Sequence, residues 1–71
     1  MKKENIESKV LDLFYINGNI AVNIDDFIND YEEKTELDKR FIITSIKNHQ
    51  EEYNKVLSEI VKELEKQITE R

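Results

Sequence analysis

The chain has 71 residues, a net charge of −5 at pH 7, and equal shares of 38% charged and 38% hydrophobic residues. One domain over residues 1–71 is the most that this length allows, and so small a core usually needs additional support. The absence of cysteine excludes disulfides and thiolate zinc sites, and a single histidine leaves little for a structural metal. Oligomerisation remains, so the composition indicates an all-α domain that associates.

The first helix is expected at about residues 4–16. Ile6, Val10 and Leu13 recur at the spacing of one helical face. Asn17-Gly18 is expected to end this helix, because glycine adopts the left-handed conformation of a helix C-terminus at little cost. Residues 19–22 are then expected to form a short extended link packed on the core.

A second helix is expected at about residues 24–34. Asn23 is a favourable N-cap, and Asp25 and Asp26 would lie in the first turn, where the helix dipole favours negative charge. Its apolar side chains follow one helical face: Ile24, Phe27, Ile28 and Tyr31.

The third helix is expected at residues 36–69, opened by Thr35 and Asp38 as a variant of the capping box. No glycine or proline occurs from Thr35 to Arg71. A helix of that length spans roughly 50 Å, whereas a globule of this chain length has a diameter of roughly 30 Å. Its apolar stripe comprises Leu37, Phe41, Ile42, Ile46, His49, Tyr53, Leu57, Ile60, Leu64 and Ile68.

This difference in length predicts association. The two short helices would cover only the first half of the third, and monomers seldom expose a large contiguous apolar patch. We therefore expect a homodimeric helical bundle, or a hetero-complex, formed through residues 53–68. The competing prediction is a break at Asn48 to Gln50 that lets residues 51–69 fold back as a fourth helix. The expected self-association residues are Tyr53, Leu57, Ile60, Val61, Leu64 and Ile68.

Catalytic, metal and cofactor sites are not expected. Asp26, Asp30 and Glu33 share a helical face, but carboxylates on a helix lack the loop carbonyls that complete calcium sites. His49 is not preceded by the Glu-x-x-His spacing of dimetal bundles. The serines and threonines belong to no recognisable arrangement for nucleophilic catalysis.

The expected function is a non-enzymatic protein-interaction module, a self-associating regulator or inhibitor of a larger macromolecule. Many isoleucines, lysines and asparagines suggest a low-GC bacterium, a phage or a plasmid as the source. No apolar run approaches the roughly 18 residues that cross a bilayer, and a cytoplasmic location is expected. A basic partner is the candidate for the acidic second helix, through Asp25, Asp26, Asp30, Glu32 and Glu33.

The alternative function is a DNA-binding transcriptional regulator. Residues 39–50 contain three basic side chains and no acid, and they follow two short helices as a recognition helix would. The outline loosely resembles a winged-helix core, in architecture alone. The net charge of −5 opposes DNA binding, because phosphate neutralisation supplies most non-specific affinity. The residues concerned are Lys39, Arg40, Lys47 and His49.

Overall fold

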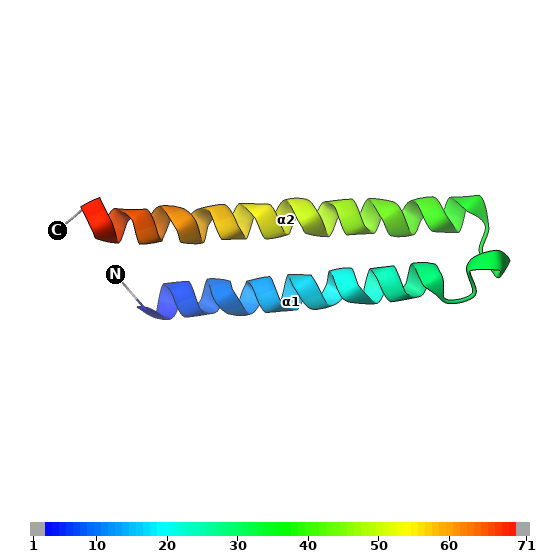
Figure 1. Ribbon diagram of the computed structural model, residues 1–71, viewed down its shortest axis with the longest axis horizontal. Helices are drawn as coiled ribbons and strands as arrows, with labels where there is room; N and C mark the ends of the chain where they lie inside the picture. The colour runs from blue at the N-terminus through cyan, green and yellow to red at the C-terminus, as the bar shows by residue number, and fades with distance from the viewer. Residues whose placement is uncertain (1–2, 70–71) are drawn as a thin grey trace.

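The computed structural model describes residues 3–69 as a long antiparallel helical hairpin (Figure 1). Helix α1 spans Lys3–Ile28, the 3-10 helix η1 spans Tyr31–Glu33, and α2 spans Glu36–Thr69; residues 3–69 contain no strand. The hairpin measures 57 × 15 × 11 Å, with a radius of gyration of 16.6 Å. A compact chain of this length would have a radius of gyration of about 11 Å. The all-α prediction is confirmed, and the molecule is an elongated one.

The prediction of three helices is wrong, because the segments expected at 4–16 and 24–34 are joined in α1. No glycine has a positive φ, so Gly18 does not end a helix, and residues 19–22 are helical rather than extended. The side chains facing α2 continue across this point at alternating steps of three and four residues. Packing along that line outweighs the roughly 1 kcal/mol cost of a glycine inside a helix. The positions concerned are Leu13, Ile16, Ile20, Asn23 and Phe27.

The connection between the helices begins where α1 ends, at Ile28, six residues before the expected end. Asp30 adopts the left-handed conformation, with φ 53° and ψ 36°, which aspartate tolerates better than most residues. The Lys34 ammonium donates to the carbonyl oxygen of Asn29 and so satisfies part of the helix C-terminus. The Tyr31 ring packs 5.6 Å from the Phe27 ring, and the Lys39 ammonium lies 3.7 Å from the Tyr31 ring centre, which ties the turn to α2.

Helix α2 begins and ends where the sequence predicts. The Asp38 backbone N–H donates to Thr35 Oγ1 at 3.1 Å, and the Thr35 N–H donates to Asp38 Oδ2 at 3.3 Å, which confirms the capping box. The helix is continuous through Asn48, His49 and Gln50. The alternative of a break there, with a fourth helix after it, is therefore wrong.

Helix α1 lies along most of α2, including its second half (Figure 1), so the expectation that only the first half of the long helix is covered is also wrong. Even so, the two helices bury little. Among the described residues, Ile16 at 3% exposed and Ile60 at 7% are the buried hydrophobic side chains. Neither helix, over the residues described, is long and apolar enough to cross a membrane.

Gly18→Ala tests the continuous α1. A β-carbon added at Gly18 meets no atom within 4 Å, and its backbone is helical, so the substitution is expected to raise the free energy of unfolding by about 0.8–1 kcal/mol. Urea unfolding followed by circular dichroism measures the change. Ser58→Ala against Ser58→Gly, at an exposed position inside α2, calibrates the same alanine–glycine difference. A loss of stability in Gly18→Ala would indicate a left-handed Gly18 and a broken α1.

Candidate interaction surface

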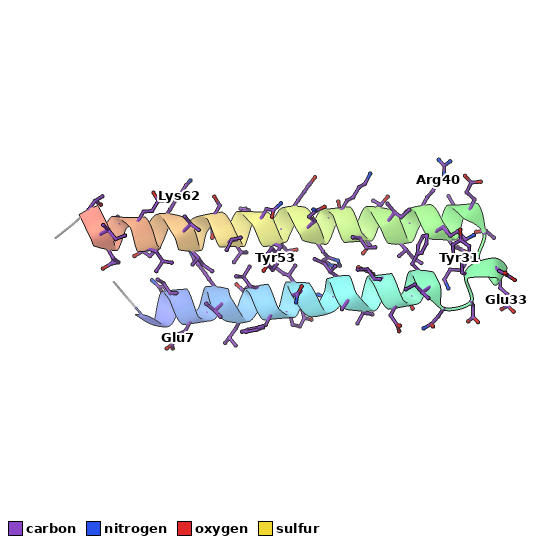
Figure 2. The ribbon with its side chains drawn as sticks, in the orientation of Figure 1. Glu7, Tyr31, Glu33, Arg40, Tyr53 and Lys62 are labelled. Carbon is purple, nitrogen blue, oxygen red and sulfur yellow. The ribbon has the colours of Figure 1, made fainter. Side chains whose placement is uncertain are left out.

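The helices meet along a seam of mostly apolar side chains, among which Asn23 and His49 are polar. On α2 the seam includes Ile42, Ile46, Tyr53, Val56 and Ile60, and Figure 2 shows Tyr53 lying between the helices while Arg40 and Lys62 point outward. These side chains lie at a- and d-type positions, as in a coiled coil. The seam contains both buried hydrophobic residues and leaves most of the flanking apolar side chains exposed.

Polar contacts fix how the helices are aligned. Asn23 Oδ1 accepts a hydrogen bond from Ser45 Oγ at 3.1 Å and lies 3.0 Å from His49 Nδ1. Near the other end, Lys9 Nζ lies 3.3 Å from Glu59 Oε2. Because Asn23 is partly buried in the seam, sliding one helix past the other would leave its amide unpaired, at a cost of about 1–3 kcal/mol. The Asn23 cluster therefore holds the register, as polar seam residues do in coiled coils.

One broad side of the hairpin carries a row of apolar side chains from both helices, half-buried at Val10 and exposed elsewhere, which we call the apolar face. On α1 the row runs from residue 10 to residue 28 in steps of four, ten and four residues, which keep it on one side of the helix. On α2 the row begins at Ile43 and resumes two heptads later at Leu57. Ile24, Ile28 and Ile43 line a common groove, so the two rows open on the same side. The apolar face comprises Val10, Phe14, Ile24 and Ile28 of α1, and Ile43, Leu57, Val61, Leu64 and Ile68 of α2.

Two open grooves lie on the apolar face. The first lies near the middle of the hairpin, between residues 10–17 of α1 and Tyr53 of α2, and the second is near the turn. Beside the first groove, toward the open end of the hairpin, we define the open-end patch as Val10 and Phe14 of α1 with Leu57, Val61 and Leu64 of α2. The Lys9–Glu59 ion pair shows that these parts of the two helices lie at the same level along the hairpin. Around the second we define the turn-end patch, which is Ile24, Ile28 and Ile43. The first groove is lined by Val10, Leu13, Phe14, Asn17 and Tyr53, and the second by Ile24, Phe27, Ile28, Ile43 and Ile46.

Small and polar residues separate the two patches. By helical spacing they occupy the same side of the hairpin as the patches, and we call them the waist. The apolar face therefore has two apolar ends and a polar middle. The waist comprises Asn17 and Ala21 of α1 and Lys47, Gln50 and Asn54 of α2.

The opposite side of the hairpin is polar. It carries mainly acids, lysines and other polar residues. Leu11 and Tyr15 form one exposed hydrophobic pair a helical turn apart, and Val22 and Phe41 are exposed separately. Single exposed hydrophobic residues are ordinary on protein surfaces, whereas a contiguous row is not. The asymmetry identifies the apolar face as the candidate interaction surface.

The six residues expected to mediate self-association fall into two groups. Ile60 is buried and Tyr53 half-buried in the seam, so both serve the hairpin's own core. Leu57, Val61, Leu64 and Ile68 are exposed on the apolar face. Five of the six lie in the single apolar stripe predicted for helix three, with Val61 beside it, because that helix was expected to have only one buried side.

Sequence reasoning missed the contribution of α1 to the apolar face, which is Val10, Phe14, Ile24 and Ile28, and also missed Ile43. The signal was present. Val10 and Phe14 are repeated two heptads later by Ile24 and Ile28. The repeat is visible only once α1 is treated as continuous through Gly18.

The five acids suggested as a partner surface lie at or near the turn, in the acidic tip, which we define as residues 25–40. Asp25 Oδ2 accepts a hydrogen bond from Asn29 Nδ2 at 3.2 Å. Figure 2 shows Glu33 at the very end of the hairpin. All five side chains are exposed: Asp25, Asp26, Asp30, Glu32 and Glu33.

The basic residues proposed for nucleic acid are not gathered on one free surface. Lys39 lies over the Tyr31 ring, Arg40 pairs with Glu36 at 2.9 Å, and His49 contacts Asn23, while Lys47 is exposed in the waist. A helix-turn-helix needs two helices crossing at roughly 90–120°. Within residues 3–69, the helix that precedes residues 39–50 is instead antiparallel to α2.

No group of three or more potential metal-ligating side chains is gathered in residues 3–69. Comparison with known protein families, with curated proteins and with solved structures finds no match. The geometry of the hairpin and its apolar face is therefore the basis for assigning a function.

Asn23→Ala tests the seam contact. Removal of the shared acceptor is expected to lower the free energy of unfolding by about 1–2 kcal/mol. A double-mutant cycle with His49→Ala should give a coupling of at least about 0.5 kcal/mol. Asn48→Ala, at an exposed position beside His49, is the matched control and should change stability by less than about 0.5 kcal/mol. Strictly additive effects of Asn23→Ala and His49→Ala would contradict the contact.

Proposed function

We propose that this chain is a non-enzymatic interaction module that self-associates through its apolar face into a homodimeric four-helix bundle. The observation that carries the proposal is the surface a single copy leaves exposed. The accessible area is 5945 Å², against about 4,650 Å² for a folded monomer of this mass. The excess, roughly 1,300 Å², is more than the roughly 800 Å² that each partner buries in a standard interface.

The chemistry of the apolar face supports a helical partner. Isoleucine, leucine, valine and phenylalanine side chains lie along both helices at the spacing that interlocks with other helices. Two such hairpins stacked face to face would enclose a core between four helices. A second copy supplies the matching surface without any further molecule, and a two-fold pair uses the same patch on both subunits.

The proposed role for the dimer is regulation or inhibition of a larger macromolecule by binding. Once the apolar faces are covered, the strongest remaining feature of each subunit is the acidic tip, where residues 25–40 contain seven acids and three bases. Such a charge distribution steers encounters with basic surfaces.

Leu57→Asp combined with Leu64→Asp tests self-association. Both side chains are exposed on the apolar face and outside the seam, so the substitutions bury charge only in the dimer. Light scattering at micromolar concentration should give a mass near 17 kDa for the unmodified chain, twice 8.5 kDa, and near 8.5 kDa for the double variant. The dimer dissociation constant should increase at least 100-fold, since charge buried without a partner costs several kcal/mol.

The matched control is Tyr15→Asp combined with Val22→Asp, which removes two exposed hydrophobic residues from the opposite side and adds the same charge. This variant should remain dimeric. A mass near 8.5 kDa for the unmodified chain, or equal weakening by both double variants, would refute the proposal.

A further inference from the structure

We propose that the second copy packs on the apolar face antiparallel to the first, so that the two acidic tips lie at opposite ends of the dimer. The inference rests on the proposed self-association and specifies its geometry. It is carried by an approximate two-fold symmetry of the α1 row and of the middle of the α2 row of the apolar face.

On α1 the apolar face is symmetric about residue 19. Val10 and Ile28 lie nine residues on either side of that point, and Phe14 and Ile24 lie five residues on either side. The waist residues Asn17 and Ala21 lie two residues on either side. An antiparallel copy of α1 centred there therefore places apolar residues on apolar ones and the small waist residues on each other.

On α2 the corresponding centre lies between residues 50 and 51. Lys47 is mirrored there by Asn54, Ile43 by Leu57 to within a residue, and Gln50 lies next to the centre. The rest of the α2 row, which is Val61, Leu64 and Ile68, falls opposite residues 33–40 of the partner's acidic tip, so on α2 the symmetry covers the middle of the row. Antiparallel α2 helices centred at this point bring Ile43 against Leu57 and Lys47 against Asn54.

The two centres lie at the same level of the hairpin. Asn23 contacts Ser45 and His49, whose mean position is residue 47. Residue 23 of α1 therefore lies level with residue 47 of α2. Because the helices are antiparallel, residue 19, four residues earlier on α1, lies level with residue 51, four residues later on α2. One axis across the apolar face therefore relates both helices of one copy to those of the other, as a closed two-fold dimer requires.

Charge distinguishes this arrangement from the parallel one, in which both tips lie at the same end. A parallel dimer would set two acidic tips side by side, each with seven acids and three bases. An antiparallel dimer sets each tip beside the open end of its partner, where residues 3–16 and 54–69 together hold six acids and five bases. Repulsion between like charges within a Debye length of about 8 Å therefore disfavours the parallel form.

Because the chain has no cysteine, single-cysteine variants test the orientation directly. Glu33→Cys, labelled with a nitroxide, places one spin at each tip. Residue 33 lies 14 residues beyond the centre at residue 19, so in the antiparallel dimer the two copies of residue 33 are separated by the length of about 28 helical residues, which is about 40 Å. Double electron–electron resonance on labelled dimer is expected to give a distance of about 40 Å or more.

Gln50→Cys supplies an independent readout, because this position faces its own copy only in the antiparallel dimer. Under mild oxidation it should form an intermolecular disulfide, for which the Cα atoms must approach to within about 7 Å. Glu51→Cys, the neighbouring residue on the outer surface of α2, is the control and should crosslink far less.

Light scattering on each labelled or oxidised sample separates the possible failures. A dimeric mass with a tip-to-tip distance below about 25 Å would overturn the antiparallel arrangement and leave self-association standing. A dimeric mass with Gln50→Cys no more crosslinked than Glu51→Cys would also overturn it. A monomeric mass for the unmodified chain would overturn both proposals.

Discussion

The structure depends on the packing of two long helices along a single seam. Two helices have only one mutual contact line, so each can bury only one narrow side, and Ile16 and Ile60 are the hydrophobic residues that become buried in residues 3–69. The seam also fixes the register through Asn23, Ser45 and His49. Everything apolar beside the seam remains exposed to water, which is why the hairpin has an apolar face.

The same constraint explains the elongated shape. A chain of 71 residues would bury more surface by folding into three or four short helices, but α1 continues through Gly18 and α2 through Asn48 to Gln50. The residues that could have ended a helix earlier are outweighed by contacts made along the whole length. The hydrophobic surface that is missing inside one copy can be supplied by another copy, and small domains commonly gain stability in this way.

The long second helix could be predicted from its sequence because its signals are local. Thr35 and Asp38 form the cap that their spacing indicates, and no glycine or proline interrupts the helix. The first helix could not be predicted, because Asn17-Gly18 is a local signal for a helix end, whereas the packing that overrides it comes from residues more than 20 positions away. The division of the α2 stripe into seam and apolar face likewise depends on where α1 lies. Ile60 and Leu57 are both hydrophobic and near in sequence, and only the position of α1 makes one a core residue and the other a surface residue.

Thermal unfolding followed by circular dichroism over a 100-fold range of protein concentration tests the central claim, that the hairpin completes its core with a second copy. If folding is coupled to association, the unfolding midpoint rises with concentration, because mass action stabilises the associated form. We expect such a rise, together with a shared transition for helix loss and dissociation. The same midpoint at every concentration would contradict it and would show that the seam alone holds the hairpin folded.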